Sequence, residues 1–286
     1  MMLLKNLIYQ NNQMKKQIEI SPYGSLLVYK NYYTRDDIRY IIQEKNLKGL
    51  RIFIQLKEEK LPDLNFLSEY SFLEALDITS VEDYDFSFLA NLSNLKNLSI
   101  ISEGKNIIDL SNQINLENLT IKWRKGQVSG LENCSKIIEL CLVEYTEKDI
   151  KPISSLINLL HLKIKTASLK DLDGIEKIKK LRTLLLGNCN QLISIDKLQS
   201  LSNLTSLHFE SCAKIYNFNE IGNLLSLESL AINDCKAVFS INFIKNIPSL
   251  KWLSLLGNTN IVDGDLIPAE NIKDVYYKQR KHYNRR

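Results

Sequence analysis

A recurring spacing of 23 residues is the feature that most constrains how this chain can fold. A six-residue pattern, apolar at positions one, four and six, opens at Leu181, Leu204, Leu227 and Leu250. The ninth position of the same four copies holds Cys189, Cys212, Cys235 and Asn258. Four copies in one register are unlikely to arise by chance, so the pattern indicates a repeat protein.

The same hexad can be followed toward the N-terminus at intervals of 21 to 23 residues. These earlier copies open at Leu73, Leu95, Leu116, Ile137 and Leu159. Apolar residues three apart precede each hexad, as in Ile153, Leu156 and Leu159, and this spacing is typical of a short 3₁₀ segment. Each repeat is therefore expected to be a strand, a turn and a short helical segment. Stacking against neighbouring repeats would bury its leucines.

The L-x-x-L-x-L-x-x-N/C pattern resembles leucine-rich repeats, and repeats of about 22 residues are similar to the bacterial, internalin-like class. The resemblance covers about residues 62–258. It implies an α/β leucine-rich-repeat solenoid with a parallel concave β-sheet and short 3₁₀ or helical segments on the convex side. The predicted division is an N-terminal cap with a short helix over 1–46, the solenoid over 47–258, and a C-terminal cap with a basic tail over 259–286.

Residues 1–46 lack the repeat and have signals of their own. Short strands are predicted at Gln17–Ile20 and Ser25–Tyr29, around a turn at Pro22-Tyr23-Gly24. Thr34-x-x-Asp37 has the form of a capping box, which predicts a helix over about 35–45 that buries Ile38, Ile41 and Ile42. A strand containing Leu50, Ile52, Ile54 and Leu56 follows, in a register that the pattern leaves open. Tyr23, Tyr29, Tyr32, Tyr33 and Tyr40 cluster here. This segment is interpreted as a cap, with an aromatic binding element as the alternative.

Strand parity predicts which side chains could meet a partner. Positions three, five and seven of each repeat point away from the core, because successive strand residues face opposite sides. The partner-binding candidates at these positions are His161, Lys163, Lys165, His208 and Glu210, and Trp123 and Tyr145, along the edge beside them, are expected to project outward as well. They combine aromatic groups, which contribute much of the energy at interfaces, with charges that steer association. A solvated face without a partner is the alternative. For Trp252, burial under the C-terminal cap is the favoured interpretation.

The amino-acid composition bears on the cellular compartment and on the kind of partner. The five cysteines are an odd number, which argues against a disulfide framework, and three of them share a repeat position where a thiol packs well. With no convincing signal peptide and no run of 18 apolar residues, this predicts a cytoplasmic protein that does not span a membrane. Residues 278–286 hold five Lys or Arg and no acid, which leaves the rest of the chain close to neutral and does not favour nucleic acid as a partner.

The sequence contains no motif typical of catalysis, metal binding or phosphate binding. The three histidines lack metal-ligand spacing, and no C-x-x-C motif or glycine-rich phosphate loop occurs. Cys141 beside His161 and Lys163 is the best catalytic candidate, but the paired backbone of a strand ladder leaves no donors for an oxyanion. The chain is therefore predicted to be no enzyme, with no cofactor and no metal site.

The predicted function is a non-enzymatic module that binds another protein through the concave face. Asp263-Gly264-Asp265-Leu266 and Lys281-His282-Tyr283 resemble the tails of bacterial intracellular leucine-rich-repeat proteins encoded near polymorphic toxins. That resemblance implies an immunity or antitoxin-like role, with a toxin as the partner. The alternatives are a structural adaptor in a larger complex and a nucleic-acid-associated protein that acts through the basic C-terminal tail.

Overall fold

The computed structural model describes residues 18–21, 24–29, 33–54 and 63–284, which form two compact units. The first unit runs to Ile121 and includes residues 126–136, whereas the second contains residues 122–125 and continues from Ile137. Some residues of the predicted strands, the predicted turn and the tyrosine cluster lie outside the described residues. They are Gln17, Pro22, Tyr23, Tyr32 and Leu56.

The first unit is built on one sheet with the strand order β1-β2-β3-β4-β5-β7. Its strands are β1 (Ile18–Ser21), β2 (Gly24–Val28), β3 (Gly49–Ile54), β4 (Ala75–Ser80), β5 (Asn97–Ser102) and β7 (Asn118–Lys122), whose last residue belongs to the second unit. β1 and β2 pair antiparallel, and the later neighbours pair parallel. Short 3₁₀ segments η2 (Asn65–Glu69), η3 (Ser87–Asn91) and η4 (Leu131–Asn133) link the repeats, and β6 (Ile108–Asp109) pairs with β8 (Val128–Ser129).

The predicted N-terminal helix is confirmed as α2 (Arg35–Glu44). Its capping box is complete: the Asp37 N–H donates to the Thr34 hydroxyl at 3.1 Å, and the Thr34 N–H donates to the Asp37 carboxylate at 2.8 Å. The helix buries Ile38, Ile41 and Ile42, as predicted. The open register of the next strand is settled by pairing, because Leu50 and Ile52 face Leu76 and Ile78 and so occupy positions four and six.

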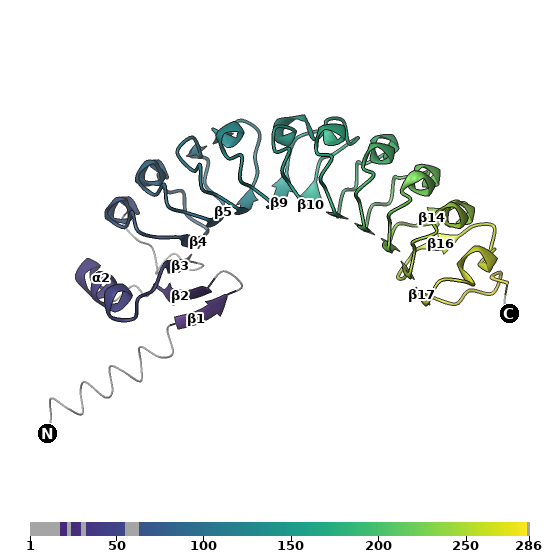
Figure 1. The fold of residues 1–286 in the computed structure, drawn as a ribbon, viewed down its shortest axis with the longest axis horizontal. Coiled ribbons are helices and arrows are strands. Elements are labelled where there is room, and N and C mark those ends of the chain that lie inside the picture. Colours follow the sequence, from purple (N-terminus) through teal and green to yellow (C-terminus); the bar gives the residue numbers. More distant parts are fainter. Residues whose placement is uncertain (1–17, 22–23, 30–32, 55–62, 285–286) are drawn as a thin grey trace, which may run out of the picture. The chain divides into compact units, whose positions relative to one another are not determined.

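The second unit repeats one strand–turn–3₁₀ module along a parallel sheet with the order β9-β10-β11-β12-β13-β15-β17 (Figure 1). Its strands are β9 (Glu139–Tyr145), β10 (His161–Ala167), β11 (Thr183–Gly187), β12 (Ser206–Glu210), β13 (Ser229–Asn233), β15 (Trp252–Leu255) and β17 (Asp274–Tyr277). The 3₁₀ segments are η5 (Lys151–Ile153), η6 (Ile175–Lys177), η7 (Asp196–Ser200), η8 (Asn219–Asn223), η9 (Asn242–Asn246) and η10 (Ile267–Ala269). A second ladder joins β14 (Ala237–Val238) to β16 (Asn260–Ile261).

The predicted hexads form the core of both units. Equivalent positions pair in register, so that Leu184 lies beside Leu207 and Leu207 beside Leu230. The apolar residues at positions one, four and six are all buried from the Leu73 hexad to the Leu250 hexad. This confirms the repeat that the spacing predicted, with short 3₁₀ segments on the side opposite the strands.

The end of the repeat differs from prediction in one respect. β17 adds a strand beyond Leu255, and its Asp274 and Val275 pair with Trp252 and Leu253. The described part of the basic tail then returns to the last repeat. The Tyr283 hydroxyl accepts the Ile261 N–H at 2.9 Å, and the Arg280 guanidinium donates to the Thr259 carbonyl at 2.9 Å. Tyr283 is buried, so this segment is part of the C-terminal cap.

The ninth-position cysteines are buried and free, as predicted: Cys189, Cys212 and Cys235. Asn258 departs from that column because it is exposed, and Thr259 takes the buried place. The Thr259 hydroxyl donates to the Ile232 carbonyl at 2.7 Å and accepts the Cys235 N–H at 3.1 Å, which satisfies polar groups at the end of the column.

Candidate protein-binding groove

The backbone at position eight decides which side chains turn inward where each strand ends. In the second unit this position has a positive φ at Glu144, Thr166, Asn188, Ser211, Asp234 and Gly257. One left-handed residue breaks the strand alternation, and the following residue is buried in four of these six repeats: Tyr145, Cys189, Cys212 and Cys235. The repeats that open at Leu73, Leu95 and Leu116 have no positive φ there, and the eighth residue itself is buried: Ser80, Ser102 and Trp123.

The prediction that Trp123 and Tyr145 project outward is therefore wrong. Trp123 is only 4% exposed because alternation continues to position eight, whereas Tyr145 is fully buried at position nine, behind the left-handed Glu144. Their ring centroids lie 5.6 Å apart. Lys122, also placed in an outward column by parity, is buried and its ammonium lies 2.8 Å from the Glu144 carboxylate. These residues pack the beginning of the second unit.

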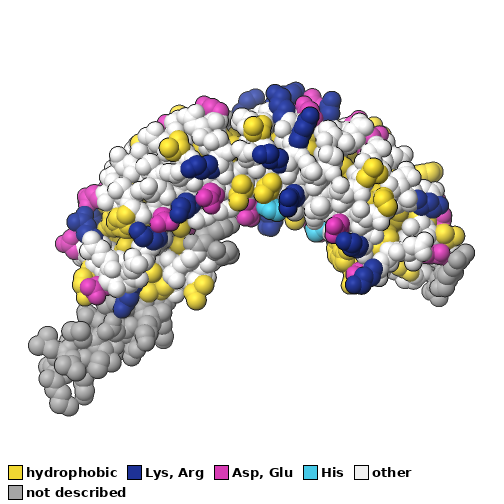
Figure 2. Space-filling model, viewed as in Figure 1, with side chains coloured by type: hydrophobic (Ala, Val, Ile, Leu, Met, Phe, Trp, Pro, Cys, Tyr) yellow, Lys and Arg dark blue, Asp and Glu magenta, His cyan; other side chains and the backbone are white. Residues whose placement is uncertain are grey.

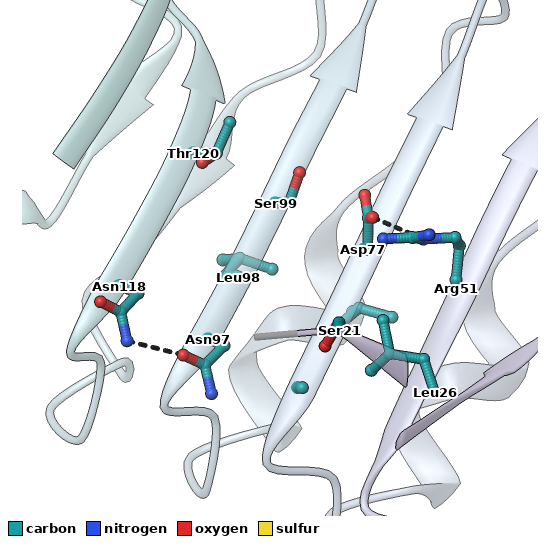
Figure 3. A pocket seen from close by; sticks show the side chains of 11 residues that line it. Ser21, Leu26, Arg51, Asp77, Asn97, Leu98, Ser99, Asn118 and Thr120 are labelled. Carbon is teal, nitrogen blue, oxygen red and sulfur yellow. Dashed lines mark hydrogen bonds and ion pairs between the residues drawn. The ribbon is translucent and has the colours of Figure 1, made fainter. Parts of the chain in front are cut away.

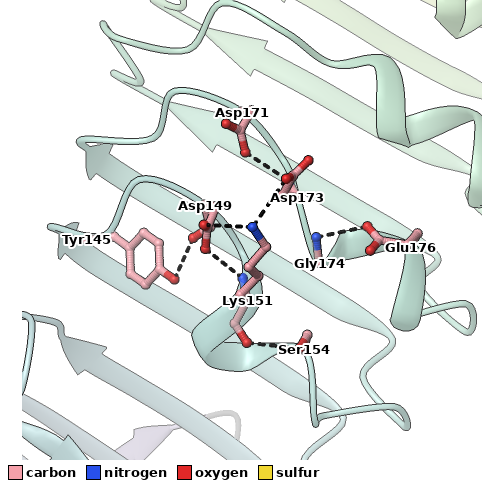
Figure 4. A network of polar contacts seen from close by, with 8 residues as sticks. All are labelled: Tyr145, Asp149, Lys151, Ser154, Asp171, Asp173, Gly174 and Glu176. Carbon is pink, nitrogen blue, oxygen red and sulfur yellow. Dashed lines mark hydrogen bonds and ion pairs between the residues drawn. The ribbon is translucent and has the colours of Figure 1, made fainter.

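The buried Tyr145 is anchored to the neighbouring turn (Figure 4). Its hydroxyl donates to the Asp149 carbonyl at 2.9 Å, and burial holds its pKa well above the ordinary value. The Lys151 ammonium lies 3.5 Å from the Asp149 carboxylate and 3.3 Å from that of Asp173. Tyr145 therefore has a structural role in this turn.

The other five predicted site residues lie on β10 and β12 of one sheet. His161 and Lys165 are exposed, Lys163 and His208 are half-buried, and Glu210 is exposed. Four of them, Lys163, Lys165, His208 and Glu210, line a groove of about 400 Å³ on the strand face of the second unit. The groove is also lined by Leu185, Gly187, Asn188, Ala231, Asn233 and Trp252. His161 does not line it.

Small residues make the groove possible. Gly187 and Ala231 stand at outward positions of β11 and β13, where long side chains would fill the space. Lysines of β10 form one side, and aromatic residues form the other. The His208 and Trp252 ring centroids lie 5.7 Å apart, and those of Trp252 and Tyr276 lie 5.9 Å apart. Trp252 is half-buried in this row, which corrects the expectation that the C-terminal cap would bury it.

The lysines of the groove differ from other cations on the strands. Arg51 contacts the Glu19 and Asp77 carboxylates, and Lys122 contacts Glu144. Within the described parts of the chain, neither Lys163 nor Lys165 has a carboxylate within ion-pair distance. The groove therefore presents two cations and one acid, Glu210, that do not pair with one another, which leaves an excess of positive charge.

His208 is neutral in the same groove at neutral pH. Burial lowers its pKa below the ordinary value, because the imidazolium form loses hydration there. Its Nε2 lies 3.2 Å from the Ser229 hydroxyl and 3.4 Å from that of Ser206. The imidazole is thus held between hydroxyls and beside Trp252, as an aromatic and hydrogen-bonding surface rather than a third cation.

The first unit has a smaller, differently composed pocket of about 140 Å³ on its own strand face (Figure 3). The Arg51–Asp77 ion pair, at 2.8 Å, forms one part of it. Asn118 donates to the Asn97 side-chain carbonyl at 2.7 Å, and Ser99 and Thr120 add hydroxyls. Its two charged lining groups already pair with each other, which distinguishes it from the groove.

Other kinds of site are not seen in the described residues. They contain no cluster of three or more His, Cys, Asp or Glu side chains that could hold a metal ion. None of the helices among them is long and apolar enough to cross a membrane.

Comparisons with known proteins bear on the fold. No family model matches the sequence, and no curated protein matches it. An internalin, InlF, from Listeria monocytogenes is 20% identical, with a TM-score of 0.53, over 90% of this chain and 86% of that chain. The internalin InlC2 of the same species is 23% identical, with a TM-score of 0.52, over 66% of this chain and 83% of that one. This chain has the leucine-rich-repeat fold.

A third leucine-rich-repeat neighbour is the functional domain of InlJ from Listeria monocytogenes, described as including a cysteine ladder. It is 16% identical, with a TM-score of 0.51, over 88% of this chain and 68% of that chain. The column of Cys189, Cys212 and Cys235 occupies consecutive repeats here. At these identities the likeness concerns the fold, and the groove must be interpreted from its own residues.

Proposed function

We propose that this leucine-rich-repeat chain is a non-enzymatic module that binds another protein in the groove of its second unit. The observation that carries the proposal is the pair of unmatched lysines, Lys163 and Lys165, opposite the aromatic row of His208 and Trp252. A cation wall favours carboxylates by charge complementarity, and aromatic surfaces supply binding energy at interfaces. The partner segment is therefore expected to be acidic and to carry an apolar or aromatic side chain.

The charge reversal Lys163→Glu plus Lys165→Glu tests this proposal on the protein that co-purifies with the full chain. Binding measured by calorimetry should weaken at least about tenfold, or roughly 1.4 kcal/mol, because both cations would become acids facing an acidic segment. Association of the wild type should also slow as salt rises.

Lys177→Glu plus Lys179→Glu is the matched control, because it makes the same charge change at exposed residues away from the strand face. Normal binding by the groove variant, together with loss of binding after changes at Tyr33 and Tyr40, would place the site on the N-terminal cap instead.

The narrower proposal is a cytoplasmic immunity role, in which the bound partner is a toxin. It is supported by the tail resemblance and by the five free cysteines. The two tail motifs also meet: a side chain on Gly264 would collide with the His282 carbonyl, and Asn284 donates to the Asp265 carboxylate at 2.6 Å. Protection of cells from the product of a neighbouring toxin gene, lost in the groove variant, is the expected result.

The nucleic-acid alternative requires the basic tail to be available. Tyr283 and Arg280 hold part of that tail against the last repeat, so deletion of 278–286 would damage the cap as well as remove charge. Lys278→Gln plus Lys281→Gln is the cleaner test, since both side chains are exposed. Salt-dependent binding to nucleic acid that disappears in this variant would favour the alternative.

A further inference from the structure

A second surface runs along the turns that follow the strands of the second unit. In six repeats a side-chain oxygen of Asp, Ser or Asn accepts the backbone N–H two residues later, at 3.0 to 3.3 Å. These turns begin at Asp149, Asp171, Ser194, Asn217, Ser240 and Asp263. The residue just before each turn therefore occupies one equivalent place. We call these residues the turn-side stripe: Lys148, Lys170, Ile193, Tyr216, Phe239 and Val262.

Backbone hydrogen bonds join the first three members of the turn-side stripe across neighbouring repeats. The Lys170 N–H donates to the Lys148 carbonyl at 2.8 Å, and the Ile193 N–H donates to the Lys170 carbonyl at 2.9 Å. At the other end, the Asp263 N–H donates to the Phe239 carbonyl at 3.1 Å. The paired strands of the same repeats are about 4.8 Å apart, and at that spacing six repeats extend over roughly 24 Å.

The apolar members of the stripe are unusually exposed. Tyr216 and Phe239 are 72% and 74% exposed, and Ile193 and Val262 are each 46% exposed. Figure 2 shows hydrophobic side chains exposed at several places on the visible surface of the protein. The fold does not demand apolar groups here, because lysines hold the same place in two repeats. Exposed apolar side chains at one place in four consecutive repeats indicate an interaction site.

The chemistry of the stripe selects the kind of partner. Lys148 and Lys170 are exposed, and no ion pair to either is found in the described part of the chain. The acids that follow them are engaged elsewhere: Asp149 and Asp173 contact the Lys151 ammonium, and Asp171 accepts the Asp173 N–H (Figure 4). The stripe thus has a cationic end and an apolar end, which a ligand with carboxylates at one end would complement.

The spacing of the stripe matches a helix. Successive turns of an α-helix are 5.4 Å apart, close to the repeat spacing of about 4.8 Å, whereas same-side residues of an extended strand are about 6.8 Å apart. A row of roughly 24 Å corresponds to about 16 helical residues. We propose that the turn-side stripe binds an amphipathic helix of a protein partner, with acidic residues over Lys148 and Lys170 and apolar residues over Tyr216 and Phe239.

This surface is separate from the groove, and its test uses the full chain as bait for a phage-displayed library of random 16-residue peptides. Enriched peptides should carry apolar residues at a helical spacing of three or four, with Asp or Glu at one end. For the best such peptide, fluorescence anisotropy should show at least about tenfold weaker binding to Tyr216→Ser plus Phe239→Ser. Lys148→Glu plus Lys170→Glu should weaken it too.

Two matched variants separate this proposal from its alternatives. Ile157→Ser plus Leu225→Ser changes apolar residues of similar exposure, 59% and 60%, away from the stripe and should leave peptide affinity unchanged. The groove variant Lys163→Glu plus Lys165→Glu should also bind the peptide normally. The inference is overturned if no helix-patterned peptide is enriched or if the Tyr216 and Phe239 changes leave binding intact. It is also overturned if those changes instead abolish self-association, or binding to vesicles containing phosphatidylglycerol.

Discussion

At the scale of single residues, the left-handed position at the end of each strand organises the second unit. It is occupied by glycine only at Gly257, and Thr166, with φ 56°, is the least suited of the others. A β-branched residue in this region is strained because its Cβ approaches the backbone carbonyl. Thr166 is exposed, so little packing compensates for the strain.

Thr166→Gly should therefore stabilise the protein by about 1 kcal/mol, because glycine adopts this φ without the steric cost. Urea unfolding of both proteins measures the change in the free energy of unfolding. Thr183→Gly, on regular strand β11, is the control and should destabilise the protein by roughly 0.5–1 kcal/mol. A destabilising effect at Thr166 would show that this backbone is not left-handed.

His208 gives a second residue-scale prediction, which concerns pH. Its pKa is lowered in the folded state by burial, so below the ordinary value of 6.5 the unfolded chain binds a proton that the folded chain resists. The free energy of unfolding should consequently fall as pH drops from about 6.5 toward the folded pKa. Lys163, Lys165 and Glu210 line the same groove, and burial is the cause of the lowered pKa of His208.

The measurement is an NMR titration of the His208 ring, paired with urea unfolding at pH 7.5 and pH 5.5. The loss of stability between these pH values should be smaller in His208→Asn, which cannot take up the proton. An imidazole that titrates at or above its ordinary value would contradict the burial described for it.

At the scale of elements, strand parity separates residues that build the core from residues that build the surface. Leu207 and Leu230 are fully buried at position four of neighbouring strands. Either change to Ala should destabilise the protein by about 2–5 kcal/mol through lost burial and the cavity left behind. Ser206→Ala, at the adjoining outward position, should stay within about 0.5 kcal/mol. Thermal and urea unfolding distinguish the two, and similar losses at both positions would mean a register shift of one residue.

The repeat itself could be predicted because leucines at fixed spacing have one periodic arrangement that buries them all. β17 could not be predicted, because its sequence lacks the regular leucines of the other repeats. Pairing with β15 places Ile272, Val275 and Tyr277 at positions one, four and six. Tyr276 of β17 then supports Trp252, so the place of Trp252 could not follow from its own repeat.

Part of the site could likewise be predicted from the sequence, and the residues that were placed wrongly have a local structural cause. Lys163, Lys165, His208 and Glu210 were found by parity because they lie within regular strand positions. The prediction for Trp123 was wrong because the side chain at position eight points inward or outward according to the φ angle of that residue, which the spacing does not encode. Tyr145, by contrast, stands in the ninth column with the buried cysteines, so the sequence contained that signal. The groove also had a signal in Gly187 and Ala231, small residues between long ones.

At the scale of the whole molecule, different surfaces have different chemistry. The first unit has a polar pocket whose charged residues are already paired, whereas the second has a groove with two unmatched lysines and an apolar row on its turns. The formal net charge of +4 says little about either, since residues 278–286 hold five Lys or Arg and no acid, which leaves the rest of the chain close to neutral. Recognition is therefore expected to depend on where the charges lie rather than on the total.

Lysine acetylation footprinting of the full chain, with and without the co-purifying partner, tests the central claim most directly. Mass spectrometry should show that Lys163 and Lys165 lose reactivity in the complex because the partner covers the groove. Lys177 and Lys179, on the opposite side of the repeats, should react as in the free chain. If Lys163 and Lys165 stay fully reactive while Lys45 and Lys48 beside the N-terminal helix become protected, the partner binds at the cap and the proposed groove is wrong.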